Sequence, residues 1–171
     1  MKHLIFALLV CSTSISTLPA QNANQNSKNP DQKFVTEAIE AGLAEVELGK
    51  LGQDQGNSPE IKEYGRMMEQ DHSKANDELR ALAKQFNMTL PTTFTSAMRK
   101  KHTDLKERSG QDFDQVFMKQ MIEDHRKAIA LFENEAKNGQ NEQIRTWAKK
   151  MLPTLKQHLQ HALHIYDNFQ N

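Results

Sequence analysis

Apolar side chains recur at steps of four and three residues along two long stretches of the chain, 61–86 and 144–169. This spacing places them on one face of an α-helix and is typical of helices that pack in a bundle. In each stretch one position of the apolar face is a histidine, His72 in the first and His158 in the second. The pattern therefore predicts two bundle helices that each direct one imidazole toward the interior.

Two more long helices are expected from the same periodicity, so that the four cover about 31–53, 58–87, 111–137 and 141–169. Asp31 and Ser58 are the expected N-caps of the first two. Glu45 lies in the middle of the apolar face of the first helix, and His125 lies on the apolar face of the third. A polar stretch over 95–108 has a thin apolar stripe and predicts a short additional helix.

The connections between these helices predict their arrangement. Short turns that contain glycine join the first helix to the second and the third to the fourth, which makes each pair an antiparallel hairpin. The connection between the second and third helices is much longer and holds the short helix, so it can run back along the bundle. We therefore expect an all-α, ferritin-like four-helix bundle over residues 33–169, with a simple up-and-down bundle as the alternative topology.

The N-terminal region has the pattern of a secretory signal peptide. Residues 1–20 combine a basic start, a short apolar run and a small residue at Ala20. Residues 21–32 are rich in Asn, Gln and Ser and predict a polar linker. Cys11 raises the alternative of a lipoprotein, but Val10 precedes it where such a site needs a small residue. We expect export to the periplasm or to the periphery of the outer membrane, without lipidation.

The charge balance disfavours some classes of function. Lys plus Arg and Asp plus Glu both number 22, whereas a nucleic-acid-binding protein normally carries a basic surplus. After the signal peptide, no apolar run is long enough to cross a bilayer, so any envelope association would be peripheral. The sequence also has no Gly-rich phosphate loop, no nucleophile elbow and no His-Glu-x-x-His motif, so an enzyme is the less favoured class.

Four inward polar residues are the candidate functional site. Glu45, His72, His125 and His158 each lie near the middle of one long helix, so they should meet in one layer if the helix ends are aligned. Three imidazoles and a carboxylate suit a single divalent or transition-metal ion, with Zn, Cu or Fe as the candidates.

Neighbouring residues are candidates for a supporting role or for alternative ligands. Asp71 and Asp124 each precede a histidine of the cluster and are expected to accept a hydrogen bond from a ring nitrogen. Glu69 lies three residues before His72 and is a further candidate. Met68 and Met121 each precede a histidine by four residues, and a thioether beside an imidazole favours copper, although methionine at helical spacing is also ordinary packing material.

The competing interpretation needs no metal. Here Glu45 hydrogen-bonds the histidines, and the cluster only fixes how the helices align, as a polar residue in a helical seam does. The protein would then be a non-catalytic structural or interaction module of the envelope, acting through its surface. A redox or hydrolytic enzyme is a third possibility, which requires an open coordination position.

Five stretches of the chain, 44–51, 64–72, 113–117, 121–125 and 152–158, resemble the domain-of-unknown-function 4142 family. The resemblance implies an exported bacterial envelope protein with a ferritin-like bundle, and it implies no established activity. Di-iron bundles of this shape carry two Glu-x-x-His pairs and two further Glu ligands. Only Glu69 and His72 form such a pair, because Leu155 stands three residues before His158. This departure from the di-iron pattern therefore favours one metal ion over two.

Overall fold

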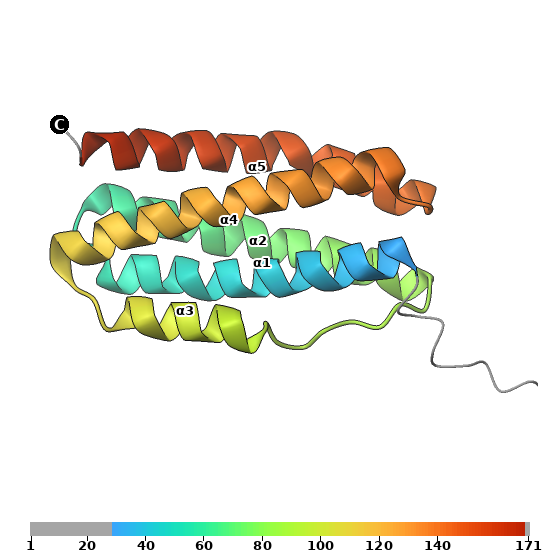
Figure 1. The fold of residues 1–171 in the computed structure, drawn as a ribbon, viewed down its shortest axis with the longest axis horizontal. Helices are drawn as coiled ribbons and strands as arrows, with labels where there is room; N and C mark the ends of the chain where they lie inside the picture. The colour runs from blue at the N-terminus through green and yellow to red at the C-terminus, as the bar shows by residue number, and fades with distance from the viewer. Residues whose placement is uncertain (1–28, 170–171) are drawn as a thin grey trace, which may run out of the picture.

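The structure is a computed structural model that describes residues 29–169, and it consists of five helices (Figure 1). No strand occurs within this range. The helices are α1 (Pro30–Gln55), α2 (Pro59–Gln85), α3 (Ser96–Lys106), α4 (Gly110–Asn138) and α5 (Glu142–Asn168). The expected signal peptide, Cys11 and the linker up to residue 28 lie outside the described residues.

Side-chain caps define where the helices begin. Asn29, and not Asp31 as expected, caps α1, because its side chain accepts hydrogen bonds from the backbone N–H groups of the first turn. Residues 30–32 are therefore helical, so the expectation that the linker extends to residue 32 is wrong. Ser58 caps α2 as expected, and its Oγ accepts from the N–H of Ile61 at 3.2 Å. Helix α5 continues through Pro153.

The long connection gives the bundle its topology. Helices α1 and α2 form one antiparallel hairpin and α4 and α5 form the other (Figure 1). After α2 the chain returns along the outside of the bundle through α3, so α4 begins at the same end as α2 and runs parallel to it. This is the crossover arrangement of ferritin-like folds and not the alternative up-and-down bundle.

The core is divided in two by a polar layer. One apolar cluster lies toward the α1–α2 turn, and its largest side chains include Tyr64, Met68, Phe117 and Met121. The other lies toward the α4–α5 turn and is built around the rings of Phe34, Phe132 and Trp147. Between the two clusters the interior positions of the four long helices carry one acidic and three imidazole side chains.

At each end of the bundle, a carboxylate of one hairpin accepts hydrogen bonds from the turn of the other hairpin. Asp31, in the first turn of α1, accepts hydrogen bonds from the N–H groups of Gln140 and Asn141 at 2.7 and 2.8 Å. Asp114, near the start of α4, accepts from the N–H groups of Asn57 and Ser58 at 2.8 and 3.2 Å. The two sets of residues are equally spaced in the sequence. Asp31 precedes Asp114, Asn57 precedes Gln140 and Ser58 precedes Asn141 by the same number of positions. These two aspartates therefore dock the hairpins in an equivalent way at both ends.

Helices α1 and α2 approach each other closely at two glycines. A Cβ placed on Gly49 would lie 2.6 Å from the carbonyl oxygen of Gly65, and one on Gly65 would lie 2.6 Å from that of Gly49. The backbone N–H groups of Glu69 and Gln53 lie almost as near, at 2.7 and 2.9 Å. A side chain cannot move these atoms aside, so the contact requires glycine on both helices.

Glu135 provides a pH-dependent contribution to stability at the α4–α5 end. Its carboxyl is buried beside that of Asp31. Burial, the charge of Asp31 and a hydrogen bond with Asp31 raise the pKa of Glu135 from 4.5 to about 7. Between pH 4.5 and about 7, the folded state keeps a proton on Glu135 that the unfolded state has lost, so the free energy of unfolding falls as the pH rises.

We expect Glu135→Gln to raise the free energy of unfolding by about 2 kcal/mol near pH 8, because the amide has no charge to bury. Near pH 5 the same substitution should change it little, because Glu135 is then protonated in the folded state. Urea unfolding at both pH values measures the difference. Glu133→Gln is the control, since Glu133 is exposed and pairs only with Lys156 at 2.7 Å among the described residues. An equal effect of the two variants near pH 8 would contradict the prediction.

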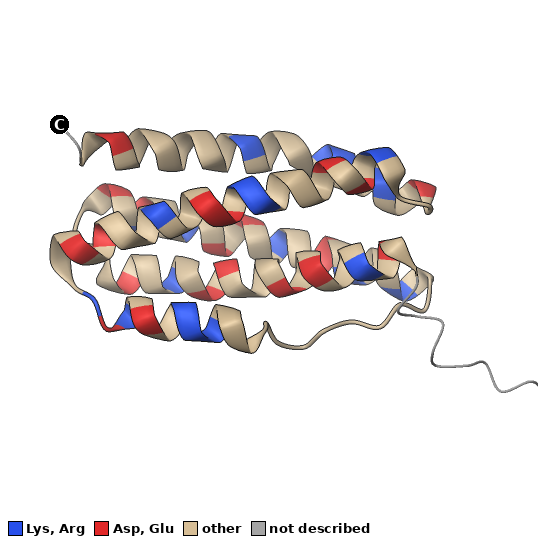
Figure 2. Ribbon diagram, in the orientation of Figure 1, with Lys and Arg blue, Asp and Glu red and all other residues tan. Residues whose placement is uncertain are grey.

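Charged side chains of both signs alternate along the helices (Figure 2). Each long helix carries residues of both signs, and several ion pairs join residues one turn apart, as in Lys50 with Glu47 on α1 and Lys127 with Asp124 on α4. Within residues 29–169 no helix is both long enough and apolar enough to cross a membrane.

Candidate metal centre

Each of the four long helices contributes one residue to the polar layer. These residues are Glu45 from α1, His72 from α2, His125 from α4 and His158 from α5. All four are buried, with exposed fractions between 0% and 6%. The structure therefore brings together the four residues that the helical periodicity directs inward.

Glu45 faces two of the imidazoles. Its Oε2 lies 2.9 Å from Nδ1 of His72, and its Oε1 lies 3.5 Å from Nδ1 of His125. Burial acts to raise the pKa of Glu45, but attraction to His72 and His125 and the hydrogen bond from His72 outweigh it and lower the pKa to about 2. Glu45 is therefore ionised near neutral pH, and it accepts a hydrogen bond from Nδ1 of His72.

The backbone of α4 holds the ring of His125. Its Nδ1 lies 2.9 Å from the carbonyl oxygen of Met121, one helical turn earlier. A carbonyl oxygen only accepts, so Nδ1 of His125 carries the proton and Nε2 is left with a lone pair. Burial lowers the pKa of His125, which keeps the ring neutral.

Asp71 holds the third ring from the edge of the bundle. Its Oδ2 lies 2.9 Å from Nε2 of His158, and its side chain is 46% exposed. The proton of His158 is therefore on Nε2, and Nδ1 has the lone pair. Burial and the nearby His72 lower the pKa of His158 to about 4, although Asp71 opposes the shift. Tyr64 also fixes this part of α5, because its hydroxyl donates to the backbone carbonyl of His158 at 3.3 Å.

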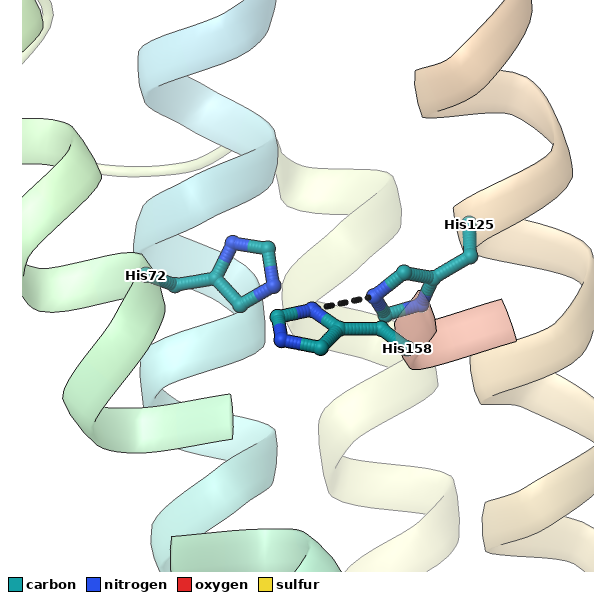
Figure 3. Close-up of side chains that lie close together, drawn as sticks. All are labelled: His72, His125 and His158. Atoms are coloured by element: carbon teal, nitrogen blue, oxygen red, sulfur yellow. Dashed lines mark hydrogen bonds between the residues drawn. The ribbon is translucent and has the colours of Figure 1, made fainter. Parts of the chain in front are cut away.

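These contacts leave one ring nitrogen of each histidine facing the other two rings (Figure 3). Ligand atoms from His72, His125 and His158 all lie within 4.8 Å of one another. Nε2 of His125 and Nδ1 of His158 are 3.4 Å apart. Nε2 of His72 is buried and has no hydrogen-bond partner in the part of the chain that the structure describes. The ring orientations are those of metal-ligating histidines, whose outer nitrogen donates to a carboxylate or carbonyl.

His72 differs from the other two rings in its protonation. Burial acts to lower its pKa, but the charge of Glu45 and the hydrogen bond to it outweigh burial and raise the pKa. In the metal-free protein, His72 and Glu45 therefore form a buried ion pair below the raised pKa of His72, whereas burial favours the neutral form of His125 and His158. A metal ion would replace the proton on Nε2 of His72.

Other residues expected at the site lie elsewhere. Asp124 forms ion pairs with Lys101 and Lys127 at 3.4 and 3.5 Å, so the expectation that it accepts from a ring nitrogen is wrong. Lys101 lies on α3 and Lys127 lies on α4, one turn beyond Asp124. Glu69 accepts a hydrogen bond from Nε2 of Gln53 at 2.6 Å, across the α1–α2 contact.

Met68 and Met121, the expected alternative ligands, are both completely buried. They belong to the apolar cluster toward the α1–α2 turn, among aromatic and aliphatic side chains. Their observed contacts are those of packing residues, which is the second of the two interpretations of methionine at helical spacing.

A small cavity adjoins the histidines on the side of the α4–α5 turn. Its volume is about 30 Å³, enough for one water molecule, and His72, His158 and Asn76 are among its lining residues. Nδ2 of Asn76 is buried and has no hydrogen-bond partner within residues 29–169. Sequence reasoning missed Asn76, although it follows His72 by four residues and so shares its helix face.

Comparisons with solved structures support the fold. A DUF305 fragment from Deinococcus radiodurans matches with a TM-score of 0.72 at 9% identity, covering 81% of this chain and 96% of that one. CopM in the Cu(I)-bound form matches with a TM-score of 0.70 at 18% identity, covering 82% and 98%. CopM in the Cu(II)-bound form gives 0.69 at 18% identity, covering 81% and 97%.

A comparison with the curated proteins found no match. The family model described as a domain of unknown function, DUF4142, matches residues 16–165, which include all five helices up to the last turn of α5. The chain therefore belongs to the DUF4142 family.

Proposed function

We propose that His72, His125 and His158 bind one transition-metal ion inside the bundle. One observation carries the proposal: three buried rings have their outer nitrogens held by Glu45, a backbone carbonyl and Asp71, which leaves three nitrogens turned toward a common centre. Without an ion, the lone pairs of His125 and His158 face each other at 3.4 Å. An ion between them would turn this repulsion into coordination.

The spacing of the nitrogens is compatible with an ion. Metal–nitrogen bonds of about 2.0–2.1 Å at tetrahedral angles place two ligand nitrogens about 3.4 Å apart. The pair from His125 and His158 already has this separation. The ligand atoms of the three rings lie within 4.8 Å of one another, so closure onto an ion requires only a small movement of the His72 ring.

Copper is the ion that we propose first. Imidazole donors suit zinc, copper and iron, so the donor set alone does not choose among them. The structural neighbour CopM, seen in Cu(I)-bound and Cu(II)-bound forms, adds support for copper. The signal-peptide pattern of residues 1–20 supports a role in the bacterial envelope, where the protein would bind the ion as part of metal handling or stress protection.

Glu45 has a positioning role in this proposal. Both of its oxygens face Nδ1 atoms, on the side of the rings away from the three converging nitrogens. Its negative charge also offsets part of the charge of the ion, which would otherwise be costly in the interior.

The alternative is that the cluster is a polar lock without a metal. The hydrogen bonds of Glu45 with His72 and of Asp71 with His158 favour this alternative, because both carboxylates have a partner without a metal ion. The two functions differ in one consequence. A metal site stabilises the folded state by an amount that grows with the logarithm of the free ion concentration. The stability of a lock without metal does not change when metal or chelator is added.

The test is a metal titration of the mature protein, purified without a His-tag. We expect one equivalent of copper in the wild type, measured by elemental analysis after desalting, and a rise in the melting temperature. The variant His72→Ala/His158→Ala should retain none. The matched control is His102→Ala/His164→Ala, which removes two histidines outside the cluster and should bind like the wild type.

A circular dichroism spectrum checks that the variants are helical, and His158→Gln replaces the double variant if that protein does not fold. Absence of bound copper, zinc and iron from the folded wild type would overturn the proposal. Equal binding by the wild type and the cluster variant would also overturn it.

A further inference from the structure

A pocket at the surface adjoins the cavity beside the histidines. A pocket of about 150 Å³ opens between α2 and α5, with the charged residues Lys74, Glu78 and Lys150 in its wall. The inner cavity and this pocket share four lining residues, Asp71, Ala75, Met151 and Thr154. These four residues therefore lie at the boundary between the surface pocket and the cavity lined by His72 and His158.

Two of the shared residues can bind a metal ion. Asp71 is half exposed, and its Oδ2 already contacts Nε2 of His158 at 2.9 Å. Met151 is half-buried and carries a thioether, a soft donor that suits Cu(I). An oxygen donor and a sulfur donor thus lie at the boundary between the surface pocket and the inner cavity.

The inner cavity has polar groups without partners. Nε2 of His72 and Nδ2 of Asn76 are buried, line this part of the core, and have no hydrogen-bond partner among the described residues. Unsatisfied buried polar atoms are costly, so the space beside them favours a polar occupant such as a water molecule.

We infer that the seam between α2 and α5 is the route by which a metal ion reaches the three histidines, with Met151 and Asp71 as its transient ligands on the way. The inference rests on the proposed function, because it requires that the histidines bind metal. It assigns a role to Met151 that the buried Met68 and Met121 cannot fill, since those lie within the apolar core.

A second cavity offers the competing route. It lies between α1, α3 and α4, has a volume of about 390 Å³, and is lined by Met98, His102 and Glu45 among others. An ion on this path meets Glu45, whose two oxygens are already turned to the Nδ1 atoms of His72 and His125. None of the three histidines lines this competing cavity, whereas His72 and His158 both line the inner cavity on the α2–α5 path.

The sequence provides an optical probe of the route. It contains one tryptophan, Trp147, which lines the inner cavity. Arrival of copper should quench its fluorescence, so mixing the full mature protein with Cu(I) in a stopped-flow instrument measures the rate of uptake. Competition with a Cu(I) chelator measures the affinity at equilibrium.

We expect Met151→Leu to slow the uptake of Cu(I) by about three- to tenfold, because leucine keeps the volume and removes the sulfur donor. The stoichiometry at equilibrium should stay at one. Met98→Leu is the matched control, since Met98 is also half-buried and lines the competing cavity. It should bind copper at the wild-type rate.

A second pair of variants tests the route by its width. Ala75→Leu narrows the shared boundary and should slow uptake of Zn(II) as well as Cu(I), while Ala97→Leu in the competing cavity should not. Uptake at the wild-type rate in both Met151→Leu and Ala75→Leu would overturn the inference, and so would slowing in Met98→Leu alone. A wild type that binds no metal at equilibrium would overturn the proposed function itself, which the rates alone cannot do.

Discussion

Glu45→Ala is expected to destabilise the metal-free protein by about 4 kcal/mol, because it removes one partner of a buried ion pair. The carboxylate of Glu45 is 2.9 Å from Nδ1 of His72, and the two side chains are 5% and 8% exposed. Without Glu45, Nδ1 of His72 loses its hydrogen-bond partner, whereas Nδ1 of His125 keeps the Met121 carbonyl. Urea unfolding near pH 7 in the presence of a chelator measures the loss.

The pH dependence of the wild type follows from the same pair. The pKa of Glu45 is lowered from 4.5 to about 2, so its contribution to stability is present above pH 4.5 and is lost as the pH falls toward 2. The raised pKa of His72 adds stability that is present below pH 6.5 and is lost as the pH rises through the folded value. The pair therefore contributes most between these limits.

Two comparisons make the Glu45 prediction specific. Glu47→Ala, two residues along α1, removes only a surface pair with Lys50 and should cost less than about 1 kcal/mol. Glu45→Leu/His72→Leu should be more stable than Glu45→Ala, because it removes the whole pair and leaves no buried charge. The prediction fails if Glu45→Ala is no less stable than Glu47→Ala.

Gly65→Ala should destabilise the protein by about 3 kcal/mol, although alanine normally favours a helix over glycine. Its Cβ would lie 2.6 Å from the carbonyl oxygen of Gly49 and 2.9 Å from the backbone nitrogen of Gln53. Both atoms are backbone, so α1 and α2 would have to separate. That separation would also move Glu45 away from His72, so metal affinity should fall together with stability.

The measurement is urea unfolding of Gly65→Ala and of Gly49→Ala, which should behave alike because the contact is reciprocal. Arg66→Ala is the control, since Arg66 is the exposed neighbour of Gly65 and its replacement should change stability by no more than about 0.5 kcal/mol. A variant Gly65→Ala as stable as the wild type would show that the helices accommodate the methyl group.

The helices and the inward residues were predictable because a helix in a bundle repeats its exposure every turn. Glu45, His72, His125 and His158 interrupt four apolar faces, so their positions alone identify them. The prediction that they meet in one layer also required helices of similar length joined by short turns. The glycines and the N-cap residues of the sequence indicate where those helices begin and end.

The partners of these residues could not be predicted in the same way. Asp71 and Asp124 both precede a histidine, yet only Asp71 reaches a ring nitrogen, because Asp124 faces the lysines of α3 and α4. The path of the crossover segment determines this difference, and periodicity within one helix carries no information about it. The roles of Asp31 and Asp114 were missed for a similar reason, since their partners lie in turns of the other hairpin.

The two aspartates at the ends of the bundle have a further consequence for the interior. Asp31 fixes the start of α1 against the α4–α5 turn, and Asp114 fixes the start of α4 against the α1–α2 turn. Sliding one hairpin along the other by a single turn would break both anchors at once. The number of residues from each anchor to the middle of its helix therefore sets the position of Glu45 and of His125 along the bundle axis. The alignment of the polar layer in the interior is thus determined by contacts at the two ends of the bundle.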